Sequence, residues 1–149
     1  MPKIAIVYRS PHHGNTKKLL DAIKAAHPEV TLVQAGEESG SLASFDVIGF
    51  ASGIYMGKLH NTVRKALASM DGAGRKAFAL FTCGDAAGAK YSDKCLSAIR
   101  ERGFETLGFF WCKALDTFGP LKLVGGVNKG KPDAEDLANA VKFFESLTF

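Results

Sequence analysis

Five short apolar runs along the chain have the composition of strands that are buried on both faces. They are rich in β-branched and aromatic residues and are bounded by glycine or polar residues. We therefore expect strands at residues 4–8, 30–33, 47–51, 76–82 and 105–112.

Segments with helical periodicity separate most of these strands. Apolar residues recur at helical spacing at Leu19, Leu20 and Ile23, at Val63, Ala66, Leu67 and Met70, and at Leu137, Ala140, Val141 and Phe144. The pattern predicts a helix that opens at residues 14–16, one capped by Asn61 or Thr62 and ended by residues 71–74, one over 92–102 and one from 132–133. Only a stunted helix at residues 42–45 fits between the second and third strands.

This alternation of strands and helices predicts an α/β fold with a three-layer, doubly wound parallel sheet of five strands. Right-handed crossovers favour the strand order 2-1-3-4-5. The chain shows no internal repeat and no linker, so we expect a single domain over residues 1–149.

Composition and charge exclude several classes of protein. No apolar run reaches the roughly 18 residues that a membrane helix needs. Three cysteines without a C-x-x-C pair favour a reducing compartment, and the chain enters a strand at once without a signal peptide, so we expect a cytoplasmic protein. The net charge of +4 indicates either a solvated basic surface or one that attracts acidic partners. No basic run with interleaved aromatics is present, so we expect no nucleic-acid partner.

The turn between the first strand and the first helix carries a candidate phosphate site. The unpaired N–H groups and the dipole of a helix N-terminus attract an anion to such a turn. Ser10, Asn15 and Thr16 can add neutral hydrogen bonds, and Gly14 opens the helix.

Three further loops join this turn at the same edge of the expected sheet. Parallel strands end at one edge, where open α/β sheets bind their ligands. The loops are residues 10–16, 52–58, 82–88 and 113 onward, and all four are irregular and glycine-bearing.

The residues of these loops resemble those of flavodoxins. Ser10, Gly14, Asn15 and Thr16 match the flavodoxin phosphate loop, Ser/Thr-x-Thr-Gly-x-Thr, although His12-His13 makes this loop one residue longer. The stretches ASGIYMGKLH and DTFGPLKLVGGVNKGKPDAEDL are similar to a branch of the family distinct from the short-chain carriers. The resemblance implies bound FMN and electron transfer, although most flavodoxins are acidic and this chain is basic.

The resemblance also implies which residues bind the cofactor. They are Ser10, His12, His13, Gly14, Asn15 and Thr16 around the phosphate, Ser52, Gly53, Ile54, Tyr55, Met56, Gly57 and Lys58 after the third strand, and Thr82, Cys83, Gly84 and Asp85 after the fourth. Tyr55 is the candidate to stack on the flavin ring, and Phe118 or Tyr91 could cover its other face.

Several of these residues have a simpler interpretation. The Gly57–Lys58 peptide either reorients when flavin N5 gains a proton, as in the family, or Gly57 only serves the turn. Tyr55 could instead cover the core at the strand end, and Cys83 could be a small buried apolar residue. His12, His13 and His60 could be interpreted as a metal cluster, but no carboxylate or cysteine has ligand spacing around them. We therefore expect His12 or His13 to bind or shield the phosphate.

Two functions follow from this pattern. The first is an FMN-binding electron carrier, since no acid, base or nucleophile constellation is visible in the sequence. We expect its redox partner proteins to have acidic docking surfaces. The alternative is an FMN-dependent reductase or dehydrogenase acting on a quinone, porphyrinogen or similar acceptor, with Ser52, Gly57 and His60 in a loosened form of a protoporphyrinogen oxidase motif and residues 113–131 as a lid. A signalling receiver domain is excluded, because Arg9-Ser10 and Ala51-Ser52 stand where such a domain needs acidic residues. A scaffold protein without flavin is a further alternative that the sequence leaves open.

Overall fold

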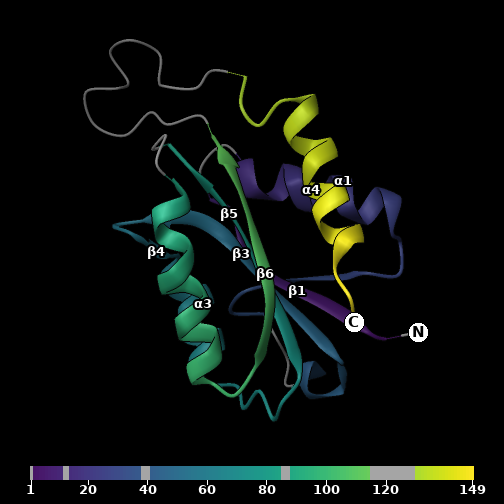
Figure 1. The fold of residues 1–149 in the computed structure, drawn as a ribbon, viewed down its shortest axis with the longest axis vertical. Coiled ribbons are helices and arrows are strands. Elements are labelled where there is room, and N and C mark those ends of the chain that lie inside the picture. Colours follow the sequence, from purple (N-terminus) through teal and green to yellow (C-terminus); the bar gives the residue numbers. More distant parts are fainter. Residues whose placement is uncertain (1, 12–13, 38–40, 85–87, 115–129) are drawn as a thin grey trace.

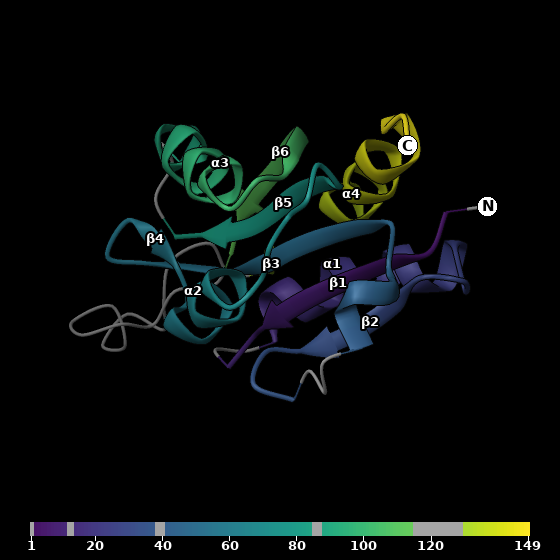
Figure 2. The ribbon, with the colours of Figure 1, turned by 90° about the horizontal axis from the view of Figure 1, so that it is seen from below.

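A twisted β-sheet with helices on both faces forms the framework of the protein (Figures 1 and 2). The computed structural model describes residues 2–11, 14–37, 41–84, 88–114 and 130–149. The strands are β1 Ile4–Arg9, β2 Thr31–Gln34, β3 Val47–Tyr55, β4 Lys58–Leu59, β5 Lys76–Cys83 and β6 Glu105–Lys113. The sheet order is β2-β1-β3-β5-β6, with all four neighbouring pairs parallel. The predicted fold class and strand order are confirmed, because β4 only extends the edge of β3.

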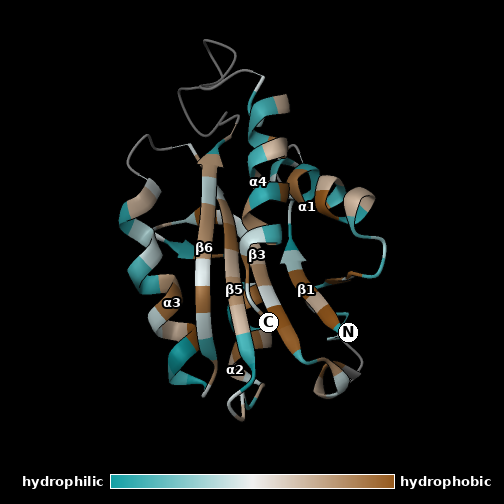
Figure 3. Ribbon diagram, turned by 45° about the vertical axis from the view of Figure 1, so that its right-hand side comes forward, coloured by the Kyte–Doolittle hydropathy of each residue, from teal (hydrophilic) through white to brown (hydrophobic). Residues whose placement is uncertain are grey.

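Within the described residues, four α-helices cover the sheet in two pairs. They are α1 Asn15–Ala26, α2 Asn61–Ala68, α3 Ser92–Glu101 and α4 Ala134–Ser146, and 3-10 turns occupy Ser41–Ser44 and Gly88–Tyr91. Helices α1 and α4 share one apolar cluster with the sheet, and α2 and α3 share the other. Figure 3 shows apolar residues along the strands, whereas the helices carry both apolar and hydrophilic residues. In the part of the chain that is described, no helix is long and apolar enough to cross a membrane.

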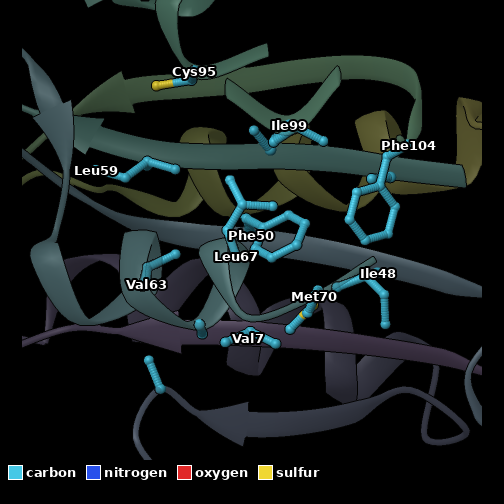
Figure 4. Packing of buried hydrophobic residues seen from close by; sticks show 14 of the residues in the cluster. Val7, Ile48, Phe50, Leu59, Val63, Leu67, Met70, Cys95, Ile99 and Phe104 are labelled. Atoms are coloured by element: carbon cyan, nitrogen blue, oxygen red, sulfur yellow. The ribbon is translucent and has the colours of Figure 1, made fainter. Parts of the chain in front are cut away.

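The strands are buried on both faces because successive side chains point to opposite helix layers. Ile6 packs with α1 and α4, and Val7 packs with α2 and α3. Phe50 lies beside Leu67 and Ile99 in the second of these layers (Figure 4). Each fully buried side chain of this size stabilises the fold by about 1.5–3 kcal/mol. The two cores therefore hold the strand ends, and the loops that follow them, in fixed positions.

The segment after β3 differs from the sequence-based expectation. Residues 52–58 were predicted as a loop, but β3 continues to Tyr55 and pairs with β4 as an antiparallel hairpin, with Tyr55 opposite Lys58. Met56 and Gly57 form the turn with φ of 52° and 79°. Positive φ at both central residues gives a two-residue turn the twist of the strands that it joins.

Helix α2 also begins and ends differently from the prediction. Its cap is His60 rather than Asn61 or Thr62, because the His60 side chain accepts a hydrogen bond from the Thr62 N–H at 3.1 Å. The helix ends at Ala68, before residues 71–74. From there Gly72 donates its N–H to the Arg102 carbonyl at 2.6 Å, and a Cβ on Gly72 would lie only 2.5 Å from the Gly103 carbonyl carbon. This close backbone contact fixes the chain after α2 against the end of α3.

Candidate functional site

The N-terminus of α1 opens at the carboxyl edge of the sheet, directly after β1. Gly14 is its N-cap, in the left-handed region with φ of 64°, and the cap makes no side-chain hydrogen bond. The first turn holds no acidic residue. A helix end of this kind carries a partial positive charge and favours an anion.

Hydroxyl groups fix this turn against the rest of the fold. The Ser10 Oγ accepts a hydrogen bond from the Lys17 N–H at 3.1 Å. The Thr16 and Thr82 Oγ1 atoms lie 2.9 Å apart in the interior, which joins α1 to the end of β5. The structure thus brings Ser10, Gly14, Asn15, Thr16 and Thr82 together at one edge, as their order in the sequence predicts. It also gives three of their hydroxyls partners inside the protein.

The base of the β3–β4 hairpin is held by Ser52. Its side chain is fully buried, donates to the Gly53 carbonyl at 2.6 Å and accepts from the His60 N–H at 2.9 Å. Ser52 is therefore placed to shape the hairpin and the entry to α2 rather than to face an open surface. Ile54 pairs with Leu59 and packs on the α2–α3 core.

The tip of the hairpin presents a half-buried aromatic ring and a fully exposed side chain. The Tyr55 ring packs over Gly53, where a Cβ would lie 3.3 Å from the Tyr55 hydroxyl, and meets the His60 ring edge-on with centroids 5.1 Å apart. Burial raises the pKa of Tyr55, and the positive charge of Arg9 lowers it by a smaller amount. The phenol is therefore neutral at neutral pH. Met56, next in the chain, is 100% exposed.

Tyr91 reaches the same hairpin from the 3-10 turn before α3. Its Cε1 lies 3.6 Å from the position that a Cβ on Gly57 would occupy. Lys58 follows in β4 with an exposed side chain. The hairpin tip and Tyr91 thus stand side by side, as expected if both face one ligand.

The end of β5 contributes less open surface than the sequence suggested. Cys83 is buried, and its carbonyl accepts a hydrogen bond from Ala114 at 3.1 Å, which ties β5 to the end of β6. Gly84 is half-buried beside it. The predicted residues His12, His13, Asp85 and Phe118 lie outside the described residues.

Arg9 belongs to this edge, although the sequence suggested no binding role for it. It is paired with Ser52 across β1 and β3, and its Nε is buried without a hydrogen-bond partner among the described residues. Strand alternation was the available signal, because Arg9 follows Val7 on the α2–α3 face. A partly buried cation thus lies beside Tyr55.

Two of the three described thiols, those of Cys95 and Cys112, are unsuited to nucleophilic chemistry. Burial raises the pKa of Cys95 to about 11 and that of Cys112 to about 12. Both are therefore protonated at neutral pH. Within the described ranges, no group of three or more His, Cys, Asp or Glu side chains could hold a metal ion.

The strand order, the paired helix layers and the glycine-bearing carboxyl edge define a flavodoxin-like α/β domain. The family described as Flavodoxin domain matches residues 5–105, about two thirds of the chain. The chain therefore belongs to the flavodoxin family.

The chain is also similar to one protein in sequence and to several solved structures in fold. The chain is 35% identical over 147 residues to an uncharacterized protein of Methanocaldococcus jannaschii, and the match covers 97% of each chain. Among solved structures, oxidised flavodoxin 2 from Bacillus cereus has a TM-score of 0.68 at 23% identity, covering 95% of this chain and 94% of that one. A flavodoxin from the domain Archaea has a TM-score of 0.65 at 18% identity, covering 93% and 91%. A flavoprotein from Lactobacillus acidophilus, solved in complex with FMN, has a TM-score of 0.57 at 16% identity, covering 74% and 93%.

Proposed function

We propose that the protein binds FMN without a covalent bond at the carboxyl edge of the sheet and carries electrons between partner proteins. The observation that carries the proposal is the acid-free N-terminus of α1, in which Ser10 accepts from the Lys17 N–H, at the same sheet edge as the Tyr55–Gly57 turn. The two segments are joined by the parallel pairing of β1 and β3. This arrangement offers an anion site and an aromatic platform in one place.

The residues present fit the parts of FMN. The first turn of α1, with Ser10 and Asn15, would hold the phosphate, and Thr16 would contribute its backbone N–H because its hydroxyl is paired with Thr82. Tyr55, Met56, Gly57 and Lys58 would line the flavin ring, with Thr82, Cys83 and Gly84 along its other edge. His12, His13 and Asp85 are proposed partners by position in the sequence alone. Bound FMN supplies chemistry in one- or two-electron steps.

The chain's own side chains suit binding and tuning. The neutral Tyr55 phenol offers a flat surface, and Gly57 has the conformational freedom that lets its peptide reorient. The described cysteines with raised pKa values supply no nucleophile. These features favour a carrier, whose reaction depends on the cofactor and on the partner protein.

Reconstitution with FMN tests the proposal directly. The purified protein is expected to be yellow, with absorbance at about 370 and 450 nm, and to release FMN on denaturation. A folded, colourless protein that takes up no FMN at micromolar concentration would contradict the proposal.

Replacing Ser10 with aspartate separates phosphate binding from helix capping. Ser10→Asp keeps an acceptor for the Lys17 N–H, so stability should be preserved. The added negative charge should weaken FMN affinity by roughly tenfold or more, because it opposes the phosphate at the helix N-terminus. Riboflavin, which lacks the phosphate, serves as the control, and its affinity should change little. Fluorescence titration measures both.

An FMN-dependent reductase acting on a quinone, porphyrinogen or similar acceptor is the second candidate. A cavity beside Tyr55, described below, favours it because a substrate could lie there. Against it, the Ser52 hydroxyl and the His60 ring are engaged in shaping the hairpin and capping α2. Turnover of NAD(P)H by the purified protein without a partner protein would support this function over the carrier.

A further inference from the structure

A cavity of about 440 Å³ opens between the β3–β4 hairpin and the first turn of α2. The hairpin lines it with Tyr55, Met56, Lys58 and Leu59. This volume lies within the range of pockets that hold small organic molecules.

Part of the cavity wall is apolar. Leu59 is 4% exposed and belongs to the core, so it forms a fixed surface. The Tyr55 ring is held edge-on against the His60 ring, while the Met56 side chain is fully exposed and free to pack on a ligand. These groups suit the flat or aliphatic body of a small molecule.

The remaining wall is positively charged. Lys58 and Arg64 line it, and neither forms an ion pair with any of the described residues. The Arg64 Nε donates to the Leu59 carbonyl at 3.1 Å, which fixes the base of the guanidinium and leaves its outer nitrogens without hydrogen bonds in the described part of the chain. Residues 47–70 contain no aspartate or glutamate. No carboxylate of this stretch therefore compensates the two charges.

The start of α2 adds to this polarity. Asn61, its first residue, also lines the cavity. The His60 Nδ1 accepts from the Thr62 N–H, so the ring is already oriented by the helix it caps. The positive end of the helix dipole thus reinforces the two cations.

We propose that this cavity is a second binding site, for a small organic acid with an apolar ring or chain. The carboxylate pairs with Arg64 and Lys58, and the apolar body lies on Leu59, Tyr55 and Met56. Because the cavity shares Tyr55 and Met56 with the flavin site, the acid would lie next to the flavin; this consequence, unlike the binding itself, rests on the proposed function. The ligand would then be a candidate redox substrate or effector.

Titration of the isotope-labelled protein with 2-naphthoate, followed by amide NMR shifts, tests the site. Shifts are expected at residues 55–64, and the neutral 2-naphthalenemethanol should bind several-fold more weakly. Arg64→Gln and Lys58→Gln should each weaken naphthoate binding by about fivefold, because each removes a charged partner of the carboxylate. Lys65→Gln is the matched control, since Lys65 is exposed on α2 next to Arg64 but does not line the cavity.

The same titration in the presence of saturating FMN separates this proposal from the proposed function. If FMN binds and naphthoate does not, the second site is overturned while the flavin site stands. If naphthoate binds and FMN does not, only the proposed function fails. Equal binding of the acid and the alcohol, an equal loss in Lys65→Gln, or complete displacement of naphthoate by FMN would each overturn a separate acid site. The Lys58→Gln variant is expected to fold normally, because no described contact depends on the Lys58 ammonium group, so weaker binding by this variant cannot be attributed to misfolding.

Discussion

The hydroxyl pair formed by Thr16 and Thr82 joins segments that are 66 residues apart in the chain. Thr16 is 1% exposed and Thr82 is 4% exposed, so neither hydroxyl has ready access to water. Each therefore depends on the other to avoid a buried, unsatisfied polar group. The pair sets the position of the first turn of α1 relative to the end of β5.

We expect Thr16→Val and Thr82→Val each to destabilise the protein by about 1–2 kcal/mol, because each leaves one hydroxyl buried without a partner. The double variant should be much less destabilised than the sum, since both polar groups are gone and the shape is kept. Urea unfolding monitored by circular dichroism measures the free energies. Additive losses would show that the two hydroxyls do not depend on each other.

The sequence was enough to predict that the site residues lie at one edge of the sheet, but not which of them contact one another. Ser10 and Thr16 follow β1 and Thr82 lies near the end of β5, and because the strand order was predictable, so was their proximity. Which hydroxyl bonds to which depends on strand register and side-chain geometry, neither of which leaves a sequence pattern. The burial of Ser52 could not be predicted for the same reason. Because β3 is longer than predicted, Ser52 lies within the strand, with its side chain toward the α2–α3 core.

At the level of elements, the β3–β4 hairpin carries backbone strain at its tip. Met56 has φ of 52°, a conformation that costs a residue with a Cβ about 1 kcal/mol or more. Its side chain is fully exposed, so no described packing offsets this cost. Asparagine adopts such a conformation more readily and precedes glycine in the preferred two-residue turn.

Met56→Asn is therefore expected to raise the free energy of unfolding by about 0.5–1 kcal/mol. Met56→Ala is the matched control, because it removes the side chain while keeping the strained backbone, and it should leave stability nearly unchanged. Urea midpoints compare the two variants. Equal stability of the two variants would show that the turn is not strained at this position.

The main elements were predictable, as was a short turn near residues 42–45, which the structure has at Ser41–Ser44, but β4 and the cap of α2 were not. Apolar runs and helical spacing give the parallel strands and the helix layers directly, since those patterns reflect burial. The two residues of β4 are too few to show a period, and Gly53 interrupts the pattern of β3. The His60 cap was missed because histidine is not among the usual cap residues.

For the whole molecule, the distribution of charge sets the carboxyl edge apart. Arg9, Lys18, Lys58 and Arg64 lie in or beside the segments that follow β1 and β3, and Lys17 is paired with Asp21, whereas the described acidic residues of this edge, Glu37, Asp133, Glu135 and Asp136, follow β2 or begin α4. Such a field attracts acidic partner proteins and favours added negative charge on a bound cofactor.

We accordingly expect the fully reduced state of bound FMN to form at a less negative potential than in acidic flavodoxins. The positive edge offsets the repulsion that an anionic reduced flavin meets in those proteins. Raising the ionic strength should shrink the difference, because salt screens exposed charges. A redox titration at low and high salt measures both effects. A potential as low as theirs at low salt would contradict this expectation.

The pairing of α1 with α4 has a consequence for how the chain acquires its structure. The inner face of α1, with Leu19, Leu20 and Ile23, shares its core with Ala140 and Phe144 of α4, more than a hundred residues later. During synthesis on the ribosome, the part of this apolar face that packs on α4 therefore stays uncovered until all the strands have been made. Chaperones would act on the chain during that interval. A nascent chain stalled before α4 is therefore expected to be the form most prone to aggregation.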